Sequence, residues 1–245
     1  MFSFFTKNKY ITDFIPNDYV DIHSHIIPGI DDGAKTIEDS KYLLQSLIEL
    51  GVDRAYTSPH TSTNIWNNSP EIITEGLEAL KVSLPELTQK LDLRVASEYL
   101  LDDEFMKLLE KDSVLTYGDN HILVEFSYLN LPINFQQLFF EIQLKGYIPI
   151  LAHPERYTYF NNQPEIFREL RKTGVKLQLN LLSLVGYYGL ETQKMADTLL
   201  KMNLYDFTGT DLHHKNHLKA LYEPIKAKHT SELTNLMQKN IKLYK

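Results

Sequence analysis

Cysteine is absent from the 245 residues of this chain, and its absence excludes several kinds of site. Without a thiol the protein can form no disulfide bond, no thiolate zinc site and no covalent cysteine intermediate. Imidazole nitrogen then becomes the main soft ligand for a metal ion, and the chain has nine histidines. The candidates for chemistry are therefore histidines and carboxylates.

Long apolar runs and an excess of positive charge are also lacking. The apolar start of the chain, residues 1–5, is followed by Lys7 and is too short for a membrane span or the core of a signal peptide. The 25 lysines and arginines against 32 aspartates and glutamates give a net charge of −7, which offers no general attraction for nucleic acid or anionic membranes. We therefore expect a cytoplasmic protein with no nucleic-acid partner and no membrane insertion.

Glycine-rich phosphate loops are missing as well, since neither G-x-G-x-x-G nor G-x-x-x-x-G-K follows a predicted strand. The chain instead shows a regular alternation of apolar strands and amphipathic helices. Strands are predicted at 19–27, 54–58, 93–100, 121–126, 147–152, 175–181 and 205–210. Helices are predicted at 36–50, from 69 onward with a kink or break at Pro85, and at 102–111, 135–145, 164–172, 191–202 and 231–244.

This alternation predicts a parallel sheet with helices outside it. Seven or eight strand–helix units match a TIM-like barrel better than an open sheet. We expect one domain, a barrel over residues 19–245, preceded by an irregular N-terminal arm at 1–18. The arm contains Phe2, Phe4 and Phe5, which could dock on a neighbouring copy or fold back on the barrel, so an oligomer is possible.

The stretch Asp21-Ile22-His23-Ser24-His25 lies in the first predicted strand. Residues two apart in a strand point to the same face, so His23 and His25 lie together, about 6.6 Å apart along the strand. This spacing suits two imidazoles that bind one metal ion or neighbouring ions. A histidine pair on a solvated edge strand would look the same. We expect Asp21 to support the site rather than to bind metal.

Other candidate ligands fall at the carboxyl ends of the predicted strands, which meet at one rim of a barrel, where active sites are built. Nine residues share this placement: His23, His25, Asp32, His60, Glu98, Glu125, His153, Asp211 and His213. One catalytic ion needs only about three protein ligands, so nine predict two or three divalent ions. Mixed imidazole and carboxylate ligation suits Mn, Fe or Zn better than Mg or Ca.

Each of these residues has a simpler interpretation. His60 could be a turn histidine, and Glu98 could cap a strand or pair with Arg94. Glu125 is harder to explain in this way, because an unpaired carboxylate in an apolar strand is unfavourable. The other histidines are expected to be structural or solvated: His121 is structural at the opposite rim, and His214, His217 and His229 are solvated.

A phosphate ester would also need a cation that does not bind metal. Arg156 lies three residues beyond His153, and its guanidinium can hold two phosphate oxygens in a fork. The alternative is a surface ion pair with Glu155 or Glu165. Lys215 and Lys219 are weaker candidates for the same role.

Six motifs together resemble the PHP (polymerase and histidinol phosphatase) superfamily, and within it the bacterial tyrosine-protein phosphatases of capsule and exopolysaccharide operons. They occur in family order from residue 21 to residue 213. The motifs are DIHSHIIPGIDDG at 21–33, TSPH at 57–60, ASE at 96–98, LVEFS at 123–127, AHPERY at 152–157 and GTDLH at 209–213.

The resemblance implies a (β/α)7 barrel with a trinuclear manganese or iron site held by the nine residues. It also implies a transition-state role for Arg156 and hydrolysis of phosphotyrosine on a tyrosine kinase of polysaccharide synthesis. One departure concerns substrate binding. Relatives carry an arginine shortly after the last motif, whereas this chain has His214-Lys215-Asn216-His217. Whether Lys215 replaces that cation stays open.

The mechanism that we expect is direct hydrolysis, in which a metal-bridging hydroxide attacks phosphorus in line. Arg156 would stabilise the phosphoryl oxygens, Asp211 would act at the metal site, and His213 or a metal-bound water could assist the leaving group. Two alternatives remain. The chain could be a small-molecule phosphatase, such as one that acts on histidinol phosphate, or a PHP-type module that binds metal or a partner without turnover.

Overall fold

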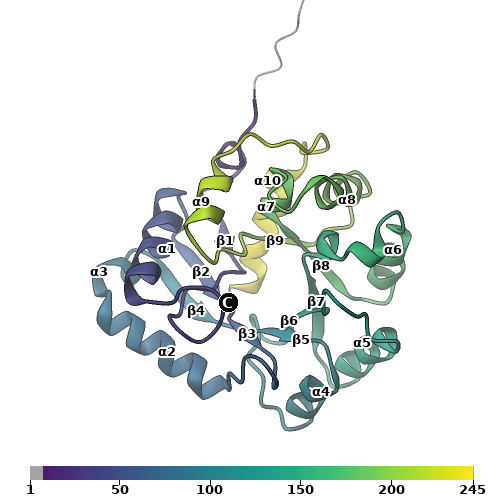
Figure 1. The fold of residues 1–245 in the computed structure, drawn as a ribbon, viewed down its shortest axis with the longest axis horizontal. Helices are drawn as coiled ribbons and strands as arrows, with labels where there is room; N and C mark the ends of the chain where they lie inside the picture. Colours follow the sequence, from purple (N-terminus) through teal and green to yellow (C-terminus); the bar gives the residue numbers. More distant parts are fainter. Residues whose placement is uncertain (1–7, 245) are drawn as a thin grey trace, which may run out of the picture.

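Parallel strands alternate with outer helices along the chain in the computed structural model, which describes residues 8–244 (Figure 1). The strands are β1 (Val20–Asp21), β2 (Arg54–Thr57), β3 (His60–Thr61), β4 (Asp92–Val95), β5 (Glu98–Leu100), β6 (His121–Glu125), β7 (Ile148–Ala152), β8 (Lys176–Asn180) and β9 (Phe207–Gly209). The helices are α1 (Ile37–Glu49), α2 (Pro70–Ser83), α3 (Pro85–Thr88), α4 (Asp103–Glu110), α5 (Phe135–Leu144), α6 (Glu165–Lys172), α7 (Leu181–Leu184), α8 (Leu190–Lys201), α9 (Lys215–Leu221) and α10 (Leu233–Gln238).

The strands form a curled parallel sheet that is interrupted twice. One part has the order β1-β2-β4 and the other β3-β5-β6-β7-β8-β9, and every pair is parallel. Two residues separate β2 from β3 and two separate β4 from β5, and the Glu98 amide donates to Pro59 O (3.1 Å) across this break. The architecture is thus a mixed α/β fold with a curled parallel sheet, as the alternation predicts.

Backbone hydrogen bonds bring the last strand beside the first. The His25 amide donates to Leu212 O (3.0 Å), and the Asp211 amide donates to His23 O (2.7 Å). Ser24 and Leu212 form an isolated parallel bridge at this point. The carboxyl end of the first strand therefore lies directly against the segment that follows β9.

Local sequence signals account for the helix boundaries. At α1, Thr36 accepts from the Asp39 amide (3.2 Å) while the Asp39 carboxylate accepts from the Thr36 amide (3.1 Å), which is the predicted capping box. Ser69 caps α2, and Pro85 separates α2 from α3, as predicted. The predicted helix at 231–244 is shorter, because α10 ends at Gln238 and continues as a 3₁₀ helix, Lys239–Leu243.

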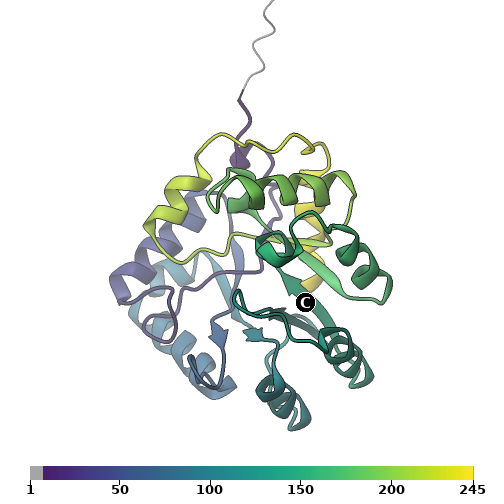
Figure 2. The same cartoon turned by 45° about the vertical axis from the view of Figure 1, so that its right-hand side comes forward.

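The inside of the curled sheet is apolar at one end and polar at the other. Val20, Leu123 and Ile150 lie in an inner apolar cluster, which the C-terminal segment closes with Leu243. Tyr56 donates from its hydroxyl to Leu243 O (2.9 Å). Tyr244 donates to Asp92 O (2.7 Å) at the start of β4, so the C-terminal segment packs at the amino ends of the strands, and its end lies near the middle of the molecule in Figure 2. The carboxyl ends are left for the histidines and carboxylates.

The predicted arm at 1–18 is partly outside the described residues, and Phe2, Phe4 and Phe5 belong to that part. Within the described part, Ile11 is buried and the Ile225 amide donates to Lys9 O (2.8 Å). Residues 8–18 therefore pack on the domain, and the boundary at residue 19 stays a prediction. Between residues 8 and 244, no helix combines the length and the apolar character that a membrane crossing needs.

Candidate metal centre

His23 and His25 follow β1 and are both fully buried, with ring centroids 5.3 Å apart. The alternative of a solvated edge strand is therefore wrong. The turn after the strand also fixes the ring of His25, because Asp31 Oδ2 lies 2.7 Å from His25 Nδ1. This contact leaves Nε2 of His25 as the nitrogen available for another partner. Carboxylates that orient a histidine in this way are common around metal ligands.

Glu98 lies at the centre of a ring of histidines. Its carboxylate is fully buried at the start of β5. Oε2 lies 3.0 Å from His23 Nε2 and 3.1 Å from His60 Nδ1, and Oε1 lies 2.9 Å from His153 Nε2. The alternative partner Arg94 lies over the Tyr244 ring (3.9 Å). Glu98 thus connects side chains from three other strand ends.

Asp211 presents its two oxygens to different neighbours. Oδ1 lies 3.3 Å from His23 Nε2 and 3.4 Å from His25 Nε2. Oδ2 accepts from Arg156 Nη1 (2.7 Å) and from Asn180 Nδ2 (2.7 Å). The residue has a left-handed backbone (φ 52°), a conformation that non-glycine residues adopt rarely and often at functional sites.

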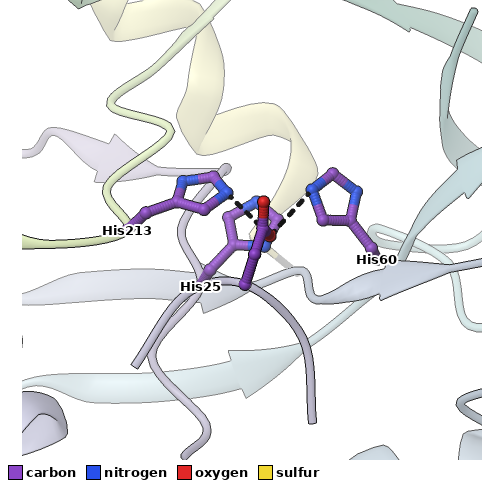
Figure 3. Close-up of side chains that lie close together, drawn as sticks. His25, His60 and His213 are labelled. Carbon is purple, nitrogen blue, oxygen red and sulfur yellow. Dashed lines mark ion pairs between the residues drawn. The ribbon is translucent and has the colours of Figure 1, made fainter. Parts of the chain in front are cut away.

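The rim of the centre is formed by His60, His213 and Asp32. Asp32 Oδ1 lies 3.4 Å from both His60 Nε2 and His213 Nε2. The His213 ring stacks on His25 at 3.8 Å, so that the three labelled histidines converge (Figure 3). Glu125 reaches the same place from β6, with Oε1 3.1 Å from His60 Nδ1. Side chains that are far apart in the sequence therefore face one small volume.

Three buried atoms of this cluster form no hydrogen bond of good geometry within residues 8–244, although other atoms of the cluster lie 3.1–3.4 Å away: His25 Nε2, His60 Nδ1 and Asp211 Oδ1. Unpartnered buried polar atoms are costly, and nitrogen and carboxylate oxygen are the donors that bind divalent transition metals. Three groups bring their ligand atoms within 4.8 Å of one another. The groups are His25, Asp32, His60 and His213; His23, His25, Glu98 and Asp211; and His60, Glu98 and Glu125. These residues fit a metal centre.

The electrostatics of the cluster favour ionised carboxylates. Burial alone would raise the pKa of Glu98, but the charges of His23 and His60 outweigh it and hold the pKa well below its ordinary value. For His60, burial by itself would lower the pKa of the imidazole. The nearby carboxylates of Glu98 and Glu125 outweigh burial and raise this pKa to about 9. The carboxylates are thus kept in the form that binds cations.

Supporting residues that the sequence did not reveal hold these side chains in place. Gln178 in β8 lies with Oε1 3.2 Å from His23 Nδ1 and accepts from the His153 amide (3.2 Å). The sequence gives little signal for Gln178, because it is one of three polar residues that alternate with leucines in β8. Asp21 accepts from the Thr210 amide (2.9 Å), so it supports the strand pair, as expected.

His217 corrects one prediction. We expected it to be solvated, but it is buried, and its Nδ1 lies 3.0 Å from Asp211 O. The reason is that α9 begins at Lys215, so the fourth residue after His213 turns inward. Burial lowers the pKa of His217 to about 3. The other two histidines, His214 and His229, are exposed as predicted.

Arg156 points at the centre rather than at a surface carboxylate. Its guanidinium lies over the rings of Tyr188 (4.0 Å) and Tyr128 (4.9 Å) and donates to Asp211. The alternative pair with Glu155 is wrong, because Glu155 is buried and accepts from the Ser183 hydroxyl (2.8 Å), the Tyr205 hydroxyl (2.9 Å) and the Asn180 amide (3.0 Å). Glu165 pairs with Arg168 instead.

A cavity of about 210 Å³ opens onto this cluster. Among its walls are Arg156, Tyr128, Tyr188 and the rim residues Asp32 and His213. A second cavity of about 220 Å³ shares Asp32, His213 and His214 with it. Lys215 lines this second cavity and has its Nζ 5.1 Å from the centre of the Tyr42 ring. Its role in substrate binding stays a prediction.

The comparisons with known proteins agree on one group. A family model described as capsular polysaccharide synthesis, CpsB/CapC, matches residues 19–240. The tyrosine-protein phosphatase YwqE of Bacillus subtilis is 29% identical over 229 residues, which are 91% of this chain and 90% of YwqE. The tyrosine-protein phosphatase CpsB of Streptococcus pneumoniae is 28% identical over 203 residues, 79% of this chain and 82% of CpsB.

A crystal structure of such phosphatases is similar too. It comes from work on YwqE and CpsB, described there as unique metal-dependent tyrosine phosphatases. It superposes with a TM-score of 0.76 and 30% identity over 90% of this chain and 86% of the compared chain. The family match at residues 19–240 includes all the residues that build the cluster.

Proposed function

The chain belongs to the CpsB/CapC family of capsular polysaccharide synthesis, and on that premise we propose that it is a metal-dependent tyrosine-protein phosphatase. The observation that supports this function most strongly is the meeting of five histidines and four carboxylates beside Arg156, in a chain without cysteine. The reaction transfers the phosphoryl group of phosphotyrosine to water and releases tyrosine and inorganic phosphate.

Two or three divalent ions complete the enzyme in this proposal, with manganese first and iron or zinc as alternatives. Their ligands are the nine predicted residues, and His153 joins the three groups of the cluster through its contact with Glu98 (2.9 Å). Such ions supply Lewis acidity, which lowers the pKa of water and neutralises charge on phosphoryl oxygens.

The residues of the chain bind and orient the ester. The guanidinium of Arg156 lies against the rings of Tyr128 and Tyr188 and lines the cavity. It is permanently charged, so it can bind phosphoryl oxygens there. Asn180 and Arg156 both donate to Oδ2 of Asp211. They thereby orient the carboxylate so that Oδ1 faces His23 and His25. The phenol of tyrosine has a pKa of about 10, so phenolate departs more readily than an alkoxide and needs less assistance from an acid.

We also infer that the curled sheet is a distorted (β/α)7 barrel. The interruptions after β2 and β4 are two residues long, so β2 with β3 and β4 with β5 count as two strands rather than four. Nine strand segments then reduce to seven strands. The hydrogen bonds between Leu212 and His25 and between Asp211 and His23 support closure.

The proposed substrate is a phosphotyrosine protein, with a bacterial tyrosine kinase of capsule or exopolysaccharide synthesis as the partner. A small-molecule phosphatase of the histidinol phosphate type is the competing enzyme, and a module without turnover is the competing non-enzyme. The proposal includes a domain at 19–245 behind the arm at 1–18, and a cytoplasmic location. It leaves the oligomeric state to measurement.

Metal analysis combined with chelation and add-back tests this function. Purified protein should contain divalent metal, lose hydrolysis of a phosphotyrosine peptide after chelation, and regain it with manganese. The peptide should have a higher kcat/KM than histidinol phosphate. Full activity in the chelated protein would contradict the metal requirement, and preference for histidinol phosphate would favour the competing enzyme.

A further inference from the structure

Tyr128 is a large aromatic residue that lines the cavity while staying half exposed. It follows Glu125 by three residues, on the segment that leaves the carboxyl end of β6. The residue is 44% exposed, whereas the other cavity tyrosine, Tyr188, is more enclosed. An aromatic ring that remains open to a cavity offers apolar area that a ligand can cover.

The inner neighbours of Tyr128 fix the position of its ring. The ring stacks on His153 with a centroid distance of 6.0 Å and an interplanar angle of 21°, and it lies 5.7 Å from the Tyr157 ring. Its hydroxyl is 3.4 Å from His153 Nδ1. Arg156 Cζ lies 4.9 Å from the ring centroid. The ring therefore needs no ligand to be held in place.

Tyr188 is the less suitable ring for contact with a substrate. It lies closer to Arg156 (4.0 Å) than Tyr128 does, and its hydroxyl is 3.2 Å from Asn180 Nδ2. Tyr188 thus supports Arg156 and Asn180, and through them Asp211. Tyr128, in contrast, stands beside the guanidinium with open area on the cavity side.

The chemistry of an aryl phosphate places its ring beside this position. The first ring carbon is only two bonds from phosphorus, so a phosphoryl group on Arg156 brings the ring next to the residues that flank Arg156. We propose that the Tyr128 ring is the wall against which the aromatic ring of the substrate packs, and that it selects aryl over alkyl phosphates. This inference rests on the proposed function and adds the residue that recognises the leaving group.

Binding of two phosphonates tests the inference without turnover. Phenylphosphonate carries the ring and methylphosphonate does not, and calorimetry on the manganese-loaded protein gives a Kd for each. The wild type should bind phenylphosphonate roughly 10-fold more tightly, the size expected for one aromatic pair with its buried area. Tyr128→Ala should remove most of this ratio and leave the Kd of methylphosphonate within about two-fold of the wild type.

Two further variants separate the ring from other effects. Tyr128→Phe keeps the ring, loses the hydroxyl near His153, and should keep the ratio. Leu129→Ala changes an adjacent side chain that is 86% exposed and does not line the cavity, and it should also keep the ratio. The Leu129→Ala control thus tests whether any substitution in this segment changes the ratio of the two Kd values.

Several results would overturn the inference. If Tyr128→Ala weakens both phosphonates equally, Tyr128 acts by positioning Arg156 or His153. If Tyr128→Phe loses the ratio, the hydroxyl is the recognition element. An unchanged ratio in Tyr128→Ala places the substrate ring elsewhere. A manganese-loaded wild type that hydrolyses no aryl phosphate overturns the proposed function as well, whereas hydrolysis with an unchanged ratio overturns this inference alone.

Discussion

Arg156 and Asp211 are joined by a 2.7 Å hydrogen bond from Nη1 to Oδ2. This bond connects the cation expected to hold phosphate with a residue expected to hold metal. Asn180 donates to the same oxygen at 2.7 Å, so Oδ2 of Asp211 keeps a hydrogen-bond donor if Arg156 is changed. Arg156 therefore has a charge-compensating contact of its own before any substrate arrives.

Replacement of Arg156 by lysine should separate these two roles. Lysine keeps the positive charge but loses the planar fork that holds two phosphoryl oxygens. We expect Arg156→Lys to lower kcat/KM for p-nitrophenyl phosphate by about 100-fold, the size of one lost transition-state donor. The metal content should stay unchanged, because Asn180 still holds Asp211. Metal analysis and steady-state kinetics measure both.

The matched control is Arg168→Lys, since Arg168 pairs with Glu165 on the outside of α6. It should leave kcat/KM within about two-fold of the wild type. Loss of metal in Arg156→Lys would contradict the division of roles and make Arg156 mainly a support for Asp211.

Glu98→Gln should remove metal as well as activity. An amide is neutral and keeps only one oxygen, so it cannot replace a carboxylate that binds cations and contacts His23, His60 and His153 through both of its oxygens. We expect the loss of at least one ion per chain and a decrease in kcat/KM of at least about 100-fold. The control is Glu110→Gln, which changes an exposed residue at the end of α4. Unchanged metal content in Glu98→Gln would show that Glu98 binds no ion.

The sequence predicted features that depend on short stretches of chain. The capping box of Thr36 and Asp39 fixes the start of α1, and Pro85 divides α2 from α3, as their sequence signals indicate. The meeting of the nine candidate ligands was also predictable, because they fall at the carboxyl ends of predicted strands and parallel strands end at one rim. Distance along the chain does not matter for this inference once the topology is known.

Features that depend on three-dimensional neighbours were not predictable. Gln178 and Asn180 lie in one strand, and their roles appear only once His23 and Asp211 lie beside them. His217 reads as a polar residue in a polar stretch, yet α9 turns it under the Asp211 carbonyl. The predicted first strand was too long, because only Val20–Asp21 pairs continuously, and beyond it Ser24 forms an isolated bridge with Leu212.

Asp197 should make a pH-dependent contribution to stability. Its carboxylate accepts from the amides of Lys228 (2.6 Å) and His229 (2.8 Å) and lies 3.0 Å from His229 Nδ1. Burial raises its pKa, but these hydrogen bonds outweigh burial and lower the pKa below the ordinary value of 3.8. A carboxylate with a lowered pKa stabilises the folded state above its unfolded pKa, and this stability is lost as the pH falls through the folded pKa.

We therefore expect Asp197→Asn to reduce the free energy of unfolding by about 1 kcal/mol near pH 7. The difference from the wild type should shrink below about pH 4, where the wild-type carboxylate begins to be protonated. Urea unfolding at a series of pH values measures it, with Asp18→Asn as an exposed control. A difference that stays constant down to pH 3 would show that shape, not charge, explains the effect.

Asn240 joins the first and last strands where they share no ladder. Its fully buried Nδ2 donates to Val20 O and to Thr208 O, both at 2.7 Å, and its Oδ1 accepts from the Thr208 amide (3.1 Å). β1 and β9 are edge strands of separate sheets, so this side chain replaces part of a missing ladder. Removing it would leave buried backbone groups without partners, at a cost of roughly 1–3 kcal/mol each.

We expect Asn240→Ala to lower the free energy of unfolding by about 3 kcal/mol, as measured by urea unfolding at pH 7. Asn235→Ala is the matched control, because Asn235 is exposed on α10 and its side chain donates to the exposed Glu232 one turn away (2.7 Å). It should change stability by less than about 0.5 kcal/mol. Equal effects in the two variants would mean that the amide of Asn240 is replaceable and that the backbone contacts of Leu212 and His25 suffice to hold the first and last strands together.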